Sequence, residues 1–196
     1  MRHPFHFDQK IASQAVAFLL RNEPGQRMNY MRLLKLLYLA ERETLAEAGI
    51  PLTGSRTVAL KRGPVLEDVF ALIRGEHPAA PEWSTYFTVE NYEIRMTADP
   101  GLGRLSRFVA AKLGDVARRH RNDDEWQMVE ITHRLPEWVK NDPGDSSKEI
   151  PLNDILAAVG READLGKIIS NARFDAMSIK VFSDDKPQTI QPQPAS

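Results

Sequence analysis

The sequence predicts a predominantly helical α+β domain, with a helical core and a small antiparallel β-hairpin or sheet. Nine of the eleven residues from Tyr30 to Ala40 are apolar. At 3.6 residues per turn they surround most of a helical cylinder, which is typical of a central core helix. Residues 83–96 instead alternate between apolar and polar side chains, which is typical of paired strands.

Two helices are predicted in the first quarter of the chain. Asp8 can cap a helix that runs to about Asn22, and its apolar residues recur on one face, at Ile11, Ala15, Phe18 and Leu19. Asn29 can cap the central helix, which Gly49 ends because glycine readily adopts the left-handed conformation found there.

The next segment combines strand and helix signals. Thr57 to Leu60 is predicted to form a short strand. Gly63-Pro64 is predicted to begin a third helix that continues to about Arg74, because proline loses no useful hydrogen bond at the first helical position. The β-hairpin follows, with Glu90-Asn91 between its strands.

Four further helices are expected in the second half of the chain. They are predicted at about 105–120, from Asp123 or Asp124 to Leu135, at 151–160, and at 161–181. Pro136 is predicted to stop the second of these helices, because a proline cannot continue it. Residues 1–182 are expected to form one domain, and the Pro/Gln-rich residues 183–196 a disordered tail.

Composition excludes several classes of function. The 196 residues carry a net charge of -1, so there is no bulk basic field of the kind that favours non-specific binding to nucleic acid or membranes. There are no cysteines, which excludes disulfides, thiolate zinc sites and cysteine nucleophiles. The N-terminal apolar stretch is short and polar residues interrupt it, so we expect a cytoplasmic protein rather than a secreted one.

The segment from Lys61 to Pro64 raises the question of an anion site. Two cations before a helix start could bind phosphate. However, the segment has one glycine rather than a Gly-rich loop, and Pro64 removes a donor that phosphate would use. We therefore favour a structural turn whose cations are displayed to a protein partner.

Other candidate chemistry is sparse. None of the five histidines forms a ligand pair of the H-E-x-x-H type, so no metal, cofactor or catalytic residue is assigned. A hydrolase that uses Asp or His, for example His133 with Glu41, stays an alternative. The basic helix end at Arg118 to Arg121 could contact phosphates, but we favour a solvated face and expect no nucleic-acid partner.

Several motifs together resemble a known family. They are the helix-turn-strand segment from Met28 to Gly75, the WSTYF sequence at 83–87, the EWQMVEITHRLPEWVK sequence at 125–140, and IPLNDILAAVG at 150–160. This order, over about residues 6–160, resembles the Panacea antitoxin domain of SocA-like and phage-associated GepA-like proteins. The sequence differs from the family pattern at Glu41, Ser55 and Arg62, where the family often has Asp, Asp, and an aromatic residue or His.

The resemblance implies a non-enzymatic antitoxin that neutralises a cognate toxin, encoded nearby, by direct binding. In the SocA-like branch it also implies an alternative: a proteolytic adaptor that delivers the toxin to a ClpXP-type protease. The candidate partner-binding residues lie around the glycine-proline turn and on the later tryptophan segment, at Lys61, Arg62, Gly63, Pro64, Val65, Glu67, Trp126, His133 and Trp138.

Overall fold

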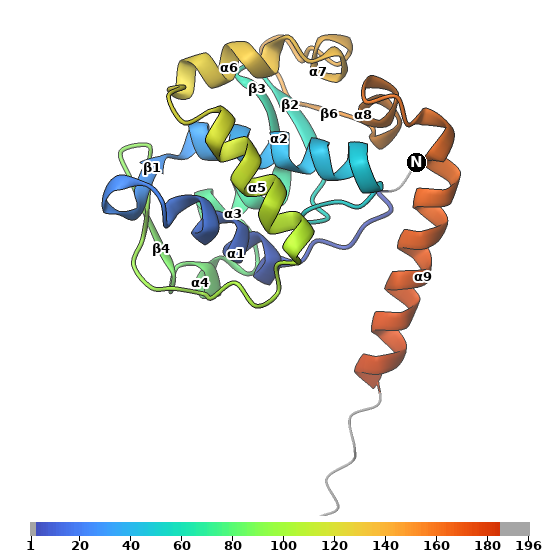
Figure 1. The fold of residues 1–196 in the computed structure, drawn as a ribbon, viewed down its shortest axis with the longest axis horizontal. Coiled ribbons are helices and arrows are strands. Elements are labelled where there is room, and N and C mark those ends of the chain that lie inside the picture. The colour runs from blue at the N-terminus through green and yellow to red at the C-terminus, as the bar shows by residue number, and fades with distance from the viewer. Residues whose placement is uncertain (1–2, 185–196) are drawn as a thin grey trace, which may run out of the picture.

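A computed structural model describes residues 3–184 of the chain. Helices surround one long central helix, and two small antiparallel sheets lie against it (Figure 1). The predicted α+β class with a helical core is therefore confirmed. Among the described residues, no helix is both long and apolar enough to cross a membrane.

The central helix is α2, Tyr30–Ala48. The side chain of Asn29 caps its start by accepting a hydrogen bond from the backbone N–H of Met31, and Gly49 ends it with a φ of 69°. Both predicted caps are confirmed. α2 packs against α1 (Gln9–Leu20), α5 (Arg107–Arg119) and α6 (Glu125–His133), so its apolar residues are buried on most sides.

The first sheet contains the predicted hairpin. Its strands are β1 (Arg27–Asn29), β5 (Glu93–Met96) and β4 (Phe87–Glu90), in that order, and all pairs are antiparallel. The turn between β4 and β5 lies at Asn91-Tyr92, one residue later than predicted, and both residues have positive φ. This geometry matches the right-handed twist of the strands. The short strand β1 was not predicted.

The second sheet corrects the prediction for Gly63-Pro64. β2 (Thr57–Leu60) is confirmed as a strand, but Gly63 to Leu66 forms a second strand, β3, that pairs with it. Lys61 and Arg62 therefore occupy the two-residue turn of a hairpin. The prediction of a helix start was wrong because Pro64 lies opposite Ala59 in the ladder. The helix α3 begins only at Glu67 and ends at Arg74.

The C-terminal half adds short helices to a second apolar cluster. α6 ends at His133, and Pro136 begins α7 (Pro136–Lys140) instead of only stopping its predecessor. α8 (Leu152–Ala158) and a short strand, β6 (Lys148–Glu149), which pairs with β2, complete this region. The shared cluster contains Leu45, Ala59, Trp138, Ile150, Ile155, Leu156 and Ile168.

The last helix packs on the second apolar cluster through Ile168, and its C-terminal end extends away from the rest of the chain (Figure 1). It is α9, Leu165–Asp184, preceded by a 3-10 turn at Glu162–Asp164, so the helix predicted at 161–181 is confirmed with a later start. The short helix α4 (Ala80–Trp83), which was not predicted, lies between α3 and β4. Of the predicted disordered tail, residues 185–196 lie outside the described part of the chain.

A buried carboxylate holds the turn that follows α2. Glu41 is 3% exposed, and its Oε2 accepts hydrogen bonds from the backbone N–H groups of Leu52 and Thr53, at 3.0 and 3.1 Å. Burial raises the pKa of Glu41 to about 7, while these hydrogen bonds act in the opposite direction. Glu41 thus has a structural role, because its hydrogen bonds hold the chain at Leu52 and Thr53 against α2.

We expect this carboxylate to make stability depend on pH. The folded-state pKa of about 7 lies above the ordinary value of 4.5. The stability that protonation contributes is therefore complete below pH 4.5 and is lost as the pH rises through 7. Between these values, the free energy of unfolding of the wild type should fall relative to that of Glu41→Gln, by up to about 3 kcal/mol.

Urea denaturation at a series of pH values measures this difference. Glu130→Gln is the matched control, because the Glu130 side chain is 74% exposed and lies 3.9 Å from its partner Arg134. Parallel pH profiles for the wild type and Glu41→Gln would contradict the interpretation.

Candidate functional site

A groove of about 460 Å³ lies where five separate segments meet. These segments are the first turns of α2, the β2–β3 hairpin, α3, the β4–β5 turn and the start of α6. Its walls are largely apolar and aromatic, formed by Tyr30, Met31, Leu34, Leu60, Val65, Phe70, Tyr92 and Trp126. Concave, mostly apolar surfaces with a few polar groups are the usual form of binding sites.

One side of the groove is formed by Arg62 and Trp126. The Arg62 guanidinium lies 5.1 Å from the centre of the Trp126 ring, close enough for a cation–π contact. Arg62 is exposed, and Trp126 is 54% exposed. An accessible arginine on an accessible tryptophan is the pair of residue types that most often dominates protein interfaces.

Two tyrosines form another part of the groove lining. The rings of Tyr30 and Tyr92 lie 5.8 Å apart, and the backbone N–H of Tyr30 donates to the Tyr92 carbonyl at 2.9 Å. Tyr92 is 66% exposed and has a φ of 67°. The sequence analysis missed both tyrosines as site residues. The signal that could have found Tyr92 is a large aromatic side chain at a hairpin turn, where burial is rare.

The groove also contains a buried amine that the sequence analysis missed. Lys35 of α2 is 1% exposed, and its Nζ donates to the Pro64 carbonyl at 2.9 Å. Burial lowers the pKa of Lys35 to about 7. The sequence signal that could have found Lys35 is its position in the middle of the apolar run from Tyr30 to Ala40. A lysine among core positions buries its apolar stem, and its amine then needs a polar partner or access to water.

Gly63 brings the β2–β3 hairpin close to this lysine. Its φ is 94°, and a Cβ atom at this position would lie 3.0 Å from the Lys35 Nζ and 2.7 Å from the Thr132 Oγ1. Only glycine combines this backbone conformation with so close an approach. Gly63 thus allows the hairpin to pack closely against α2 and α6.

The nine predicted partner residues fall into three groups. Arg62, Gly63, Val65 and Trp126 line the groove. Pro64 supports it through its hydrogen bond with Lys35. The other four lie elsewhere: Lys61 pairs with Asp145, Glu67 pairs with Arg56, and His133 and Trp138 stack on each other.

His133 and Trp138 form a packing contact beside the second sheet. Their rings are parallel within 9° and 4.0 Å apart, and the Trp138 indole N–H donates to the Leu60 carbonyl at 3.3 Å. Burial lowers the pKa of His133, and the charge of Lys35 acts in the same direction. This pair therefore supports the hairpin that carries Arg62. Trp138 is only 9% exposed, so it contributes packing rather than accessible surface.

The other two positions that depart from the family pattern have local structural roles. Ser55 is buried, accepts a hydrogen bond from the backbone N–H of Asp68, and donates to the Asp68 carboxylate at 2.8 Å. Glu41 holds the preceding turn, as described above. Arg62 is thus the one of these three residues that is exposed to a partner.

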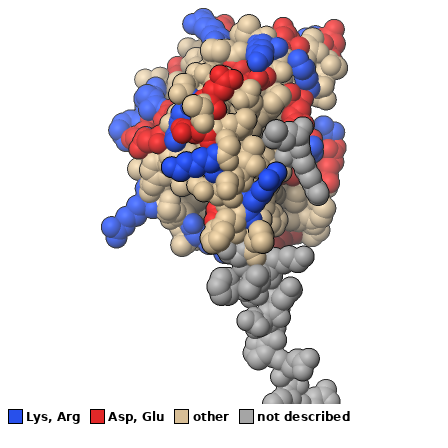
Figure 2. Space-filling view, turned by 90° about the vertical axis from the view of Figure 1, so that its right-hand side faces the viewer, with Lys and Arg blue, Asp and Glu red and all other residues tan. Residues whose placement is uncertain are grey.

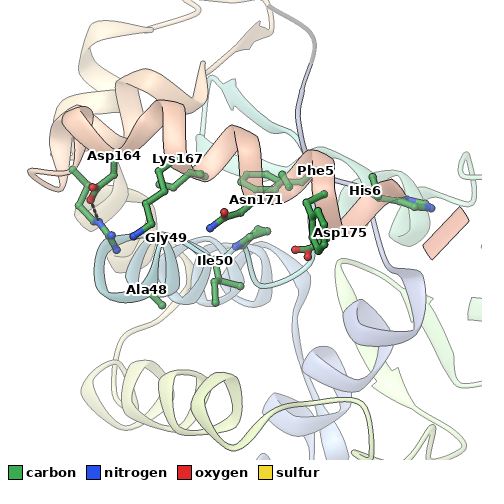
Figure 3. Close-up of a pocket in the computed structure, with 15 residues that line it drawn as sticks. Phe5, His6, Ala48, Gly49, Ile50, Asp164, Lys167, Asn171 and Asp175 are labelled. Atoms are coloured by element: carbon green, nitrogen blue, oxygen red, sulfur yellow. Dashed lines mark hydrogen bonds and ion pairs between the residues drawn. The ribbon is translucent and has the colours of Figure 1, made fainter. Parts of the chain in front are cut away.

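A second concavity, of about 440 Å³, lies between α9 and the C-terminal end of α2. Figure 3 shows Lys167, Asn171 and Asp175 of α9 facing Gly49 and Ile50. It shares no lining residue with the groove. It also contains none of the residues that the sequence singled out for binding.

Neither concavity is lined by a ready set of metal ligands. Over the described part of the chain, no three His, Cys, Asp or Glu side chains cluster in a way that could hold a metal ion. On the described part of the face that carries α8 and α9, basic and acidic side chains are interspersed (Figure 2). Such a mixture does not form the extended basic surface that nucleic-acid binding uses.

Comparison with known proteins gives one match. A family model described as "Antitoxin SocA-like, Panacea domain" matches residues 33–139, which is more than half of the chain. The matched range includes Lys35, the β2–β3 hairpin and Trp126. No curated protein and no solved structure matches the chain significantly.

We expect Gly63→Ala to disrupt the groove from within. The left-handed backbone alone should cost about 1 kcal/mol, and the contact with Lys35 and Thr132 should raise the total loss of unfolding free energy to about 2 kcal/mol or more. Gly75→Ala is the matched control, because Gly75 has a φ of 73° and nothing within 4 Å of its added Cβ. Equal losses in urea denaturation would show that the close approach has no energetic importance.

Proposed function

We propose that this chain, which belongs to the family of SocA-like antitoxins defined by the Panacea domain, neutralises a toxin protein by binding it directly. The toxin would be the product of a neighbouring gene, and the encounter would take place in the cytoplasm. Neutralisation would be steric and would need no catalytic step by this chain. Family membership supports the antitoxin role, and the groove supports the choice of surface.

The contact between Arg62 and Trp126 is the observation that carries the choice of surface. A tryptophan that is 54% exposed presents a large apolar area to water, and this area becomes favourable when a partner covers it. The guanidinium above the ring is already oriented, so less conformational entropy is lost when a partner binds. The two tyrosines of the groove extend the same aromatic surface.

Truncation of the tryptophan tests this surface. We expect Trp126→Ala to weaken toxin binding by about 30-fold, because removal of a central aromatic contact typically costs about 2 kcal/mol or more. The matched control is Val139→Ala, since Val139 is 58% exposed and lies outside the groove. Isothermal titration with the purified neighbouring toxin gives the affinity, and growth on toxin induction gives the neutralisation.

The possible outcomes test the antitoxin role and the choice of the groove as the binding surface separately. If no neighbouring gene product binds the wild-type chain, the antitoxin proposal fails. If the toxin binds and Trp126→Ala behaves like Val139→Ala, the antitoxin role is retained and the groove is the wrong surface.

The concavity beside α9 favours a second candidate, the proteolytic adaptor. An adaptor must bind toxin and protease at once, and hence needs two separate surfaces. The groove and the α9 concavity share no lining residue, and α9 extends away from the central helix (Figure 1). The exposed side chain of Met177 adds apolar surface to α9.

The lifetime of the toxin distinguishes delivery from occlusion. If the chain acts as an adaptor to a ClpXP-type protease, its presence should shorten the half-life of the toxin. Ile50→Asp, in the α9 concavity, should then restore that half-life without changing the affinity for the toxin. A toxin half-life that does not change while growth is restored would exclude the adaptor and favour occlusion.

A further inference from the structure

Among the described residues, Lys35 of the groove has no carboxylate partner. The Lys35 ammonium has three N–H groups, and the hydrogen bond to the Pro64 carbonyl is the one that the described part of the chain provides. No carboxylate contributes to its pKa, which burial alone lowers to about 7. A buried amine without an opposite charge is costly when it is protonated. A bound anion would therefore lower the free-energy cost of protonating Lys35.

The other charged and titratable groups around Lys35 come from four segments. Arg62, from the hairpin, adds a second positive charge to the groove. His133, from α6, is influenced by the charge of Lys35, which lowers its pKa further. Tyr30, from α2, and Tyr92, from the β4–β5 turn, also line the groove.

Glu125, at the start of α6, is the one acidic residue that lines the groove. Within residues 3–184 it forms no ion pair with Lys35 or Arg62. When Lys35 is protonated, two cations thus line the groove with one acid, and the groove then has an excess of positive charge.

We propose that the groove accepts a glutamate side chain of the bound protein, whose carboxylate pairs with the Lys35 ammonium while an adjacent apolar residue packs on Trp126 and Tyr92. This inference rests on the proposed function for the identity of the partner and goes beyond it in the chemistry that the partner must present. The carboxylate supplies the missing counter-charge, and the aromatic walls exclude water from the pair.

The depth of Lys35 favours a long acidic side chain over a free phosphate or a chain end. The amine is 1% exposed, whereas the aromatic rim is largely accessible, at 54% for Trp126 and 66% for Tyr92. A chain that crosses the rim can reach the amine only with an extended side chain, and glutamate is the longer of the two acidic residues. Apolar walls also disfavour phosphate, which would lose its hydration without enough donors.

Short peptides test this chemistry without the toxin. The probes are acetyl-Phe-Glu-amide, acetyl-Phe-Gln-amide and acetyl-Phe with a free carboxylate, and binding is followed through the indole N–H signal of Trp126 in NMR titrations. We expect the glutamate peptide to bind at least about 10-fold more tightly than the glutamine peptide. Equal binding, absence of any shift at Trp126, or preference for the free chain end would each overturn the proposal.

Two substitutions in the groove should act in opposite directions. Lys35→Met keeps the length of the side chain and removes its charge, so it should abolish the preference for glutamate. Glu125→Gln removes the competing acid and should tighten binding of the glutamate peptide several-fold. Lys10→Met is the control, because Lys10 is exposed and lies outside the groove, and it should change neither result. Wild-type preference retained in Lys35→Met would overturn the proposal.

The pH dependence gives a readout that altered folding would not reproduce. Binding of a carboxylate favours the protonated amine, so the affinity of the wild type for the glutamate peptide should rise as the pH falls from 8.5 through 7. Glu125→Gln, which retains Lys35, should show the same slope, and Lys35→Met should show a flat profile. A flat profile in the wild type would contradict the inference.

Once the toxin has been purified, a double-mutant cycle identifies which of its glutamates pairs with Lys35. One Glu→Gln substitution in the toxin should weaken binding to the wild type by about 10-fold and have little further effect on Lys35→Met. If the toxin binds but none of its glutamates couples to Lys35, this inference fails while the proposed function stands. If the toxin does not bind, the peptide titrations still decide the chemistry of the groove.

Discussion

The rest of the structure depends on the burial of α2. An apolar helix at the centre of a domain is common, but this one also carries polar side chains into the core, where each requires a partner. Arg32 binds the carbonyls of His120 and Asp123, and Lys35 binds that of Pro64. Tyr38 and Arg42 both donate to Glu137. Together with Glu41, these residues connect the central helix to α5, α6, α7, the hairpin and the following turn.

The same arrangement explains why the groove lies at the start of α2. Arg32 and Arg42 each pair with a carboxylate, of Glu23 and of Glu137. Within the described part of the chain, Lys35 instead donates to a single carbonyl, on a hairpin that Gly63 places close to it. The hairpin places Arg62 beside Trp126, and Tyr30 and Tyr92 contact each other in the same groove. If the groove is the surface that binds a partner, its aromatic rim would contribute apolar area and its buried amine a requirement for negative charge, which are sources of affinity and of selectivity.

Local signals predicted the helices and their ends well, because a cap or a helical period involves residues close together in the chain. Asp8, Asn29 and Asp124 each cap the predicted helix, and Gly49 ends α2. Gly63-Pro64 was misread because its glycine and proline suit a helix start as well as a hairpin. The pairing of Pro64 with Ala59 decided between them, and that pairing depends on the whole sheet. Of the residues that line the groove, Arg62, Gly63, Val65 and Trp126 were among the candidates, whereas Tyr30, Lys35 and Tyr92 were not.

By itself the sequence determined the class of the fold, the central helix, most helix boundaries and the family to which the chain belongs. These properties follow from periodicity, capping and the order of motifs, which depend only on the order of residues in the sequence. Only the tertiary structure decided that Lys35 is buried, with no carboxylate partner in the described part of the chain, and that Arg62, Tyr92 and Trp126 border one groove. The physical reason is that such contacts join segments from α2 to α6, and their distances are set by the packing of the core.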